Sequence, residues 1–281
     1  MTLLEISDLR VSYPTPGFRK PPKEVLHGIT LDIHEGETVG LVGESGSGKT
    51  TIGRAVLGLA PITGGTIRLL GTDVTHATAT QRRRLSRDLQ VVFQDPYTSL
   101  NPSMSVGDIL SEPLVTQGMG RKDARRRVRS LLDQVGLPLD AAERLPREFS
   151  GGQRQRVAIA RALAPSPKLI VCDEPVSALD LSTQARVLDL FLEIQRDTGV
   201  AYLFISHDLA VVRHVSHRVA VAYHGDIVEI GDAATVTLTP RHEYTKRLLL
   251  AAPIPDPALQ AERRAERRRA LDAQEAASIA S

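Results

Sequence analysis

The most informative stretch of the sequence is Gly43-Glu44-Ser45-Gly46-Ser47-Gly48-Lys49-Thr50. It fits the phosphate-binding loop pattern G-x-x-x-x-G-K-[ST] at every defined position. Residues 38–42 before it form an apolar run typical of a buried strand, and residues 51–58 after it indicate a helix that ends near a glycine. This order lets successive N–H groups and the helix N-terminus face a phosphate. We therefore expect a nucleotide site here; the alternative is a Gly/Ser-rich turn before a core helix.

Two side chains of the loop have expected roles of their own. Lys49 would direct its charge toward the β- and γ-phosphates, and Thr50 would offer its hydroxyl to Mg²⁺. The residues expected to surround the phosphates are Gly43, Glu44, Ser45, Gly46, Ser47, Gly48, Lys49, Thr50 and Thr51.

The composition is that of an ordinary globular protein. The chain has 281 residues, 42% of them hydrophobic, so it can bury a full core in one or two domains. Its 35 Lys and Arg residues nearly balance its 33 Asp and Glu residues, and a net charge of +2 does not argue for nucleic acid. Cys172 is the only cysteine, which excludes an internal disulfide, a multi-cysteine zinc site and a cysteine-ligated iron–sulfur cluster. Its apolar neighbours predict that it is buried.

No apolar run of the sequence approaches the ~20 residues that span a bilayer. The N-terminal residues MTLLEISDLR also lack the basic and then apolar build of a signal peptide. We expect a cytoplasmic protein whose membrane role, if it has one, depends on another chain.

Alternation of apolar and polar residues at 4–13 and 26–33 predicts a pair of antiparallel strands. Tyr13 ends the first of them, and its ring could either stack on an adenine or simply pack. After the loop's helix, Gly64-Gly65 is expected to turn into a short strand at 66–70.

A helix around 79–86 and a strand at 89–93 lead to Gln94. A glutamine at a strand end can place its amide on Mg²⁺ or on an attacking water, although most such residues only cap or solvate. The pattern is then helical from 106 to 164, and Ser150-Gly151-Gly152-Gln153 opens the last helix of this region. Its hydroxyl and free N–H groups could bind an anion, or they could form a glycine-lined N-cap.

The apolar residues 169–172 predict a strand that ends in Asp173-Glu174. An acid at this place beside a phosphate-binding loop can hold Mg²⁺, and the following glutamate can orient or deprotonate a water. After Ser177-Ala178-Leu179-Asp180 we expect a helix at 183–198 and a strand at 201–205. His207 follows this strand and could reach a γ-phosphate or could be a surface residue.

The C-terminal part begins with a predicted hairpin of residues 219–223 and 227–230. The composition shifts after Pro240, where 242–253 indicates a short helix. Residues 257–281 have too few apolar positions for a core helix and predict a frayed charged helix or a disordered tail.

Taken together and in this order, these motifs resemble those of the ATP-binding subunit of an ABC transporter, over residues 1 to about 235. The matching elements are the Walker A loop Gly43–Thr50, the Q-loop Gln94, the signature Ser150–Gln153, the Walker B pair Asp173-Glu174, the D-loop Ser177–Asp180 and the H-loop His207. Residues 94–102 and 242–253 are similar to the oligopeptide/dipeptide/nickel importer branch. Phe149 stands where leucine is commoner, and the C-terminal cysteine cluster frequent in that branch is missing.

The resemblance implies an α/β fold: a RecA-like P-loop NTPase core, an antiparallel β-subdomain at the N-terminus and an α-helical subdomain inserted at about 95–165. It also implies an ABC ATP-binding domain at 1–235 and, at 236–281, a C-terminal extension typical of peptide importers that ends in a charged, flexible tail.

The resemblance further implies an ATPase that energises import of oligopeptides or dipeptides. Its partners would be two membrane-spanning permeases, an identical or sister ATP-binding subunit in a head-to-tail dimer and, indirectly, an extracytoplasmic solute-binding protein, at the cytoplasmic face of the membrane. The alternatives are import of nickel or another small solute, or a soluble ABC ATPase that acts on ribosomes or nucleic acid. A single cassette without a long heptad insertion or zinc-ligand cysteines argues against nucleic acid.

The cofactors implied are ATP and Mg²⁺. The catalytic residues carried over from the family motifs are Lys49, Gln94, Glu174 and His207. The further ATP-binding residues are Tyr13, Ser150, Gly151, Gly152, Gln153 and Asp180, with Ser150 and Gly152 acting on the partner's ATP and Asp180 at the dimer contact. The Mg²⁺ ligands are Thr50, Gln94 and Asp173.

Overall fold

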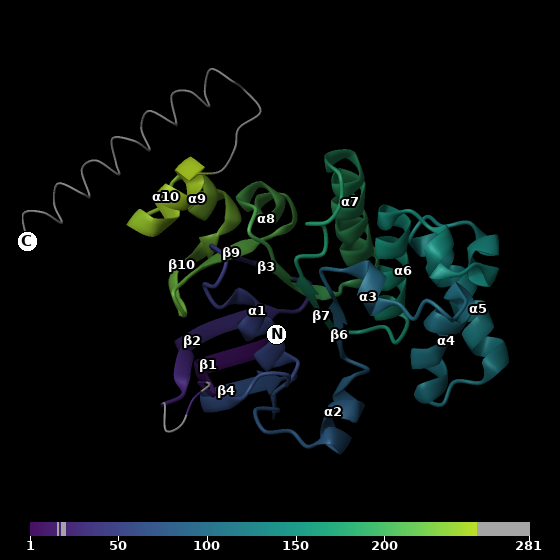
Figure 1. Cartoon of the computed structure of the whole chain (residues 1–281), viewed down its shortest axis with the longest axis horizontal. Helices are drawn as coiled ribbons and strands as arrows, with labels where there is room; N and C mark the ends of the chain where they lie inside the picture. Colours follow the sequence, from purple (N-terminus) through teal and green to yellow (C-terminus); the bar gives the residue numbers. More distant parts are fainter. Residues whose placement is uncertain (16, 18–20, 252–281) are drawn as a thin grey trace, which may run out of the picture.

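The computed structural model describes residues 1–15, 17 and 21–251, and within them the strands form two sheets (Figure 1). The first sheet is antiparallel, with the strand order β2-β1-β4-β5. Its strands are β1 (Thr2–Tyr13), β2 (Lys23–His34), β4 (Ile62–Leu69) and β5 (Thr72–Asp73). This sheet therefore combines strands from both sides of the phosphate-binding loop, as the expected β-subdomain requires.

The second sheet has the order β10-β9-β3-β8-β7-β6 and is parallel except for its edge strand β10. Its strands are β3 (Thr38–Val42), β6 (Leu89–Val92), β7 (Leu169–Asp173), β8 (Ala201–Ile205), β9 (Arg218–Tyr223) and β10 (Asp226–Asp232). Because β3, β7 and β8 are parallel, their carboxyl ends meet at one edge of the sheet.

Alternate residues of this sheet supply two different cores. On β8, Leu203 and Ile205 pack with the antiparallel sheet and with α1 (Lys49–Val56), whereas Tyr202 and Phe204 pack with the helices on the other face. A strand buried on both faces has no polar side, and all residues of β3 and β8 are buried. The helix that follows the loop is thus held between the two sheets (Figure 1).

The helices fall into three groups. Between the loop and the middle of the chain are α1 and α2 (Ala79–Leu85). The helical region, at one end of the molecule in Figure 1, contains α3 (Pro96–Ser99), α4 (Val106–Thr116), α5 (Arg121–Gln134), the short 3₁₀ turns Leu139–Glu143 and Pro146–Glu148, and α6 (Gly151–Leu163). The rest are α7 (Leu181–Thr198), α8 (Leu209–Val215), α9 (Ala233–Leu238) and α10 (Glu243–Ala251). No helix of the described residues has the length and apolarity needed to cross a bilayer.

Most predicted elements are present, and the short strand β5 is an addition to them. Gly64-Gly65 does not turn before a strand but lies inside β4, where a Cβ on Gly65 would come within 2.2 Å of the Asp8 carbonyl oxygen. The helices α8 and α9 were not predicted, because both are short, with an aspartate N-cap before the first turn. The predicted tail at 257–281 lies outside the described residues.

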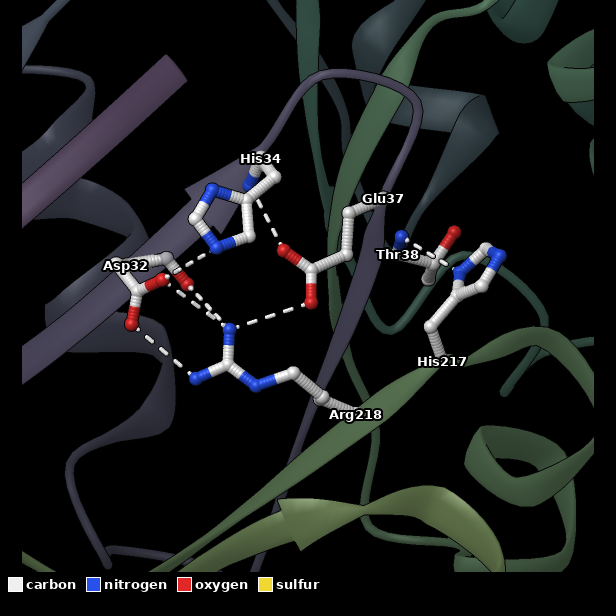
Figure 2. A network of polar contacts seen from close by, with 6 residues as sticks. All are labelled: Asp32, His34, Glu37, Thr38, His217 and Arg218. Carbon is white, nitrogen blue, oxygen red and sulfur yellow. Dashed lines mark hydrogen bonds and ion pairs between the residues drawn. The ribbon is translucent and has the colours of Figure 1, made fainter. Parts of the chain in front are cut away.

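A charged network fastens the two sheets together at the amino end of β3 (Figure 2). Arg218 on β9 donates to both carboxylate oxygens of Asp32 on β2, at 3.2 and 3.1 Å, and to Glu37 at 3.2 Å. Three further contacts belong to the network. The His34 N–H donates to Glu37, the His34 ring contacts Asp32, and the Thr38 N–H donates to His217. We call these six residues the amino-end cluster.

Candidate functional site

The candidate site lies at the opposite end of β3, where the loop Gly43–Gly48 leads into α1. Gly48 is the N-cap of α1 and has a left-handed φ of 104° that side chains disfavour. A Cβ there would also lie 2.7 Å from a methyl group of Leu26. The local sequence is therefore glycine-rich because the backbone must turn tightly against its neighbours before the helix can start.

Lys49 is buried, with 5% of its surface exposed, and its ammonium group binds the loop's own backbone. It donates to the carbonyl oxygens of Gly43 and Glu44, each at 2.7 Å, and to the Ser47 hydroxyl at 3.4 Å. Burial lowers the pKa of Lys49, which the neighbouring carboxylates partly oppose. The result is a desolvated cation in a ring of backbone groups.

Asp173, the last residue of β7, faces the first turn of α1. The Thr50 hydroxyl donates to its carboxylate at 3.2 Å. Burial raises the pKa of Asp173, while this hydrogen bond opposes the shift. The structure thus brings together two oxygen-bearing side chains that lie more than a hundred residues apart in the sequence.

Glu174 follows in a strained conformation and contacts the residue expected to act with it. Its φ of 49° lies in the left-handed region, which is uncommon for a side chain of this size, and its N–H is held by the Ile205 carbonyl oxygen at 3.0 Å. The Glu174 carboxylate contacts His207, whose Nδ1 lies 3.2 Å from Glu174 Oε2. The side chain of His207 is more exposed than that of Glu174, at 58% against 19%. We call Lys49, Thr50, Asp173, Glu174 and His207 the loop-end cluster.

Other predicted residues lie apart from this cluster. Gln94 is exposed just beyond the end of β6. Tyr13 is half-buried at the end of β1 and packs against the core between the sheets.

The signature and the D-loop residues form helix caps. The Ser150 hydroxyl accepts from the Gln153 N–H and the Gln153 amide oxygen accepts from the Ser150 N–H, which makes a capping box at the start of α6. Gly152 is closely packed, since a Cβ would lie 2.3 Å from a Thr183 methyl group. Asp180 caps α7 by accepting from the Ser182 and Thr183 N–H groups. The side-chain hydrogen bond from the Ser182 hydroxyl, at 2.7 Å, is the main cause that holds the pKa of its carboxyl well below the usual range.

Two contacts to the loop were not anticipated from the sequence. The Gly225 N–H, in the turn between β9 and β10, donates to the Ser47 carbonyl oxygen at 3.0 Å. The Glu44 N–H donates to the Tyr244 hydroxyl of α10, also at 3.0 Å. Both partners are distant in sequence from the loop, and the sequence alone does not indicate that they contact it.

The side-chain oxygens of Thr50 and Asp173 beside the loop are suitable ligands for Mg²⁺. Among the described residues no group of three or more His, Cys, Asp or Glu side chains could hold a metal by itself. Mg²⁺ is usually bound by one or two protein oxygens together with substrate phosphates and water, so a dedicated cage is not needed. Thr50 and Asp173 offer such a pair of oxygens beside the phosphate-binding loop.

Comparison with known proteins gives one consistent picture. The family described as "ABC transporter" matches residues 26–177. The oligopeptide transport ATP-binding protein OppF of Salmonella typhimurium is 49% identical over 266 residues, which cover 92% of this chain and 80% of OppF. The dimeric, post-hydrolysis structure of the ATP-binding cassette MJ0796 bound to ADP and Pi is similar with a TM-score of 0.74 and 27% identity, over 82% of this chain and 99% of the cassette. CbiO1 of Clostridium perfringens, part of the transporter complex cbiONQ, has a TM-score of 0.74 and 25% identity, over 84% and 90%.

Proposed function

The chain belongs to the ABC transporter family as an ATP-hydrolysing subunit, and on this premise we propose that it energises the import of oligopeptides. The substrate class rests on the similarity to OppF, which extends over nearly the whole chain. The observation that supports hydrolysis most directly is the convergence of the loop-end cluster at the carboxyl ends of β3, β7 and β8.

Binding of ATP would begin with the phosphates. The N–H groups of the loop and the first turn of α1 supply partial positive charge, and Lys49 adds a full charge. Its ammonium group already lies among loop carbonyls, so binding exchanges these hydrogen bonds for charge-assisted bonds to the β- and γ-phosphates. Tyr13 is the proposed contact of the adenine, at the end of β1.

Thr50, Asp173 and Gln94 are the proposed ligands of Mg²⁺. When bound, the cation would offset negative charge on the phosphate oxygens. Asp173 suits this role because its burial makes an unpaired negative charge costly and so favours association with a cation.

Hydrolysis requires a water held in line with the γ-phosphate. We assign this task to Glu174, whose carboxylate is partly buried and contacts His207. His207 keeps that carboxylate in place through Nδ1, and its exposed ring would also contact the transferring phosphoryl group. A glutamate oriented by a histidine is a suitable arrangement for drawing a proton from water.

A second cassette would complete the site. We propose that Ser150 and Gly152 act on the ATP of the partner subunit in a head-to-tail dimer, with Asp180 at the contact. Within this chain the polar groups of Ser150 and Gln153 bond to each other at an exposed helix N-terminus, which leaves that terminus to face another molecule. The dimer would attach to two permeases on the cytoplasmic face of the membrane.

The decisive experiment for hydrolysis compares Glu174→Gln with Glu193→Gln, an exposed change on α7. Removing the carboxylate should lower ATP turnover by at least about a hundredfold while ATP is still bound, because general base catalysis contributes on that scale. Glu193→Gln should keep the wild-type rate. Turnover at the wild-type rate in Glu174→Gln would remove Glu174 from the mechanism.

Transport needs a separate test. Uptake of a labelled tripeptide should be lost in cells that carry Glu174→Gln in place of the wild type and kept with Glu193→Gln. Capture of the ATP-trapped Glu174→Gln protein from detergent-solubilised membranes should recover permeases. Normal tripeptide uptake with an inactive ATPase would exclude oligopeptides as the cargo.

A further inference from the structure

The C-terminal helix α10 contacts the phosphate-binding loop directly. The Tyr244 hydroxyl accepts a hydrogen bond from the Glu44 N–H at 3.0 Å, across 200 residues of sequence. Tyr244 is almost fully buried, with 2% of its surface exposed. Glu44 is the second residue of the loop, and α10 lies well beyond residue 177, where the family match ends.

The tyrosine is itself held on two sides. Its ring packs on Tyr223 at the end of β9, with 4.0 Å between the centroids. The start of α10 is fixed by Glu229 on β10, whose carboxylate accepts from the N–H groups of Arg241 and His242 at 2.8 and 3.1 Å. Burial raises the pKa of Tyr244, so its hydroxyl keeps its proton at neutral pH. Tyr244 is therefore buried and is held both through its ring and through the start of its helix.

The loop at this point has little freedom of its own. A Cβ on Gly43 would lie 2.1 Å from the Ala222 carbonyl oxygen, so the backbone there passes directly over the end of β9. On the far side of the same turn the Gly225 N–H holds the Ser47 carbonyl oxygen at 3.0 Å. The C-terminal part of the chain therefore contacts the loop near both of its ends, at Gly43 and Glu44 and at Ser47.

We propose that Tyr244 is a positioning residue of the ATP site, which holds the Glu44 N–H and thereby fixes the loop in its phosphate-binding conformation. The proposal rests on the proposed function, because it assigns α10 a task at that same nucleotide site. A loop fixed in advance loses less conformational entropy when the phosphates bind. Nucleotide affinity should therefore depend on α10, which lies outside the matched cassette residues.

The test uses ADP, because its phosphates enter the loop without hydrolysis and without a second cassette. Tyr244→Phe removes only the hydroxyl and keeps the ring on Tyr223. The ADP dissociation constant should rise about three- to tenfold, the range expected for one lost hydrogen bond. Amide hydrogen exchange at residues 43–48 should accelerate by a similar factor, and in ATP hydrolysis the loss should fall on KM, with kcat changed less than about twofold.

Tyr202→Phe is the matched control, because the Tyr202 hydroxyl donates to the Phe191 carbonyl oxygen at 3.3 Å inside the core. It should lower the melting temperature and leave ADP affinity unchanged. If Tyr244→Phe binds ADP as tightly as the wild type, whatever its melting temperature, α10 only supports the fold and the proposal is wrong. If the wild-type chain itself does not bind ADP, the nucleotide site fails, and the role of Tyr244 fails with it.

Discussion

The two ends of strand β3 carry polar clusters of opposite character. At the Thr38 end, the amino-end cluster places Arg218 between two carboxylates, and each charge meets its opposite (Figure 2). At the Val42 end, the Lys49 ammonium of the loop-end cluster lies among backbone carbonyls. Burial shifts the pKa values of both Lys49 and Asp173 toward their neutral forms. One cluster completes its charge pairs within the chain, and the other is complementary to a phosphate and a cation.

The pKa values of the charged residues shift in opposite senses in the two clusters, toward the charged form in one and toward the neutral form in the other. Hydrogen bonding to Arg218 lowers the pKa of Asp32, and the same bonds raise the pKa of Arg218, so each folded environment favours the charged form. Burial does the reverse at the other end, where it lowers the pKa of Lys49 and raises that of Asp173. The charged groups therefore stabilise the fold at the amino end of β3, whereas at the loop end keeping the groups charged costs free energy of folding.

Lys49→Met should give the largest effect on activity. It removes the charge at the phosphates, and we expect kcat/KM for ATP to fall by at least about a hundredfold. The free energy of unfolding should be unchanged or higher, because a desolvated ammonium group is replaced by an apolar side chain. Steady-state ATPase assays and urea unfolding of the nucleotide-free protein measure both quantities, with the exposed Lys122→Met as control. A large loss of stability would show that Lys49 is needed to hold the loop together.

Arg218→Met should have the opposite profile. It leaves Asp32 and Glu37 without their cation, and we expect the free energy of unfolding to fall by about 1–3 kcal/mol, the usual worth of hydrogen bonds to charged groups. The folded fraction should keep its kcat/KM for ATP within about twofold. Urea unfolding and ATPase assays at 15 °C test this, with the exposed Arg125→Met as control. Loss of activity in fully folded protein would join the two ends of β3 into one functional unit.

The sequence predicted the loop-end cluster far better than the amino-end cluster. The loop pattern, Asp173-Glu174 at a strand end and His207 at the next strand end all follow from local rules, because parallel strands bring their carboxyl ends to one edge. Asp32, Glu37 and Arg218 follow no local pattern, since their meeting depends on how two sheets are placed together.

The same reason explains which other details were missed. The strain at Glu174 depends on the hydrogen bond between its N–H and the Ile205 carbonyl oxygen of a neighbouring strand. The contact of Tyr244 with the loop depends on the docking of a helix from the far end of the chain. The local composition predicted that helix and could not predict what it would touch.

Asp32→Asn and Asp173→Asn should change stability in opposite directions. The first removes an ionised partner of Arg218 and should destabilise the nucleotide-free protein. The second removes a half-buried carboxyl group whose ionisation is disfavoured, and should stabilise the protein slightly, by less than about 1 kcal/mol. Urea unfolding at pH 7 without nucleotide and Mg²⁺ measures both. Two changes of the same sign would remove the distinction between the clusters.

Ionisation of Asp32 should contribute to the pH dependence of the unfolding free energy of the wild type. A carboxyl group whose folded pKa is lowered contributes stability above its unfolded pKa of about 3.9, and this contribution is lost as the pH falls through the folded value. The difference in unfolding free energy between the wild type and Asp32→Asn should therefore shrink as the pH falls below about 4. Urea titrations at half-unit intervals test this; a constant difference down to pH 3 would show that Asp32 does not act through its charge.

Asp226→Asn should give the smallest effect, although it breaks an ion pair at the loop end of β3. Asp226 lies 3.3 Å from His27 Nδ1, but both side chains are well exposed, at 56% and 40%. Exposed pairs of this kind are screened by water and salt, so we expect less than about 0.5 kcal/mol of lost stability. The turn is held instead by backbone hydrogen bonds of Gly225, which accepts from the His27 N–H and donates to Ser47. Urea unfolding and the ADP dissociation constant should both stay at wild-type values. A loss as large as that of Arg218→Met would mean that ion pairs stabilise both ends of β3, and that the two ends differ only in what else they bind.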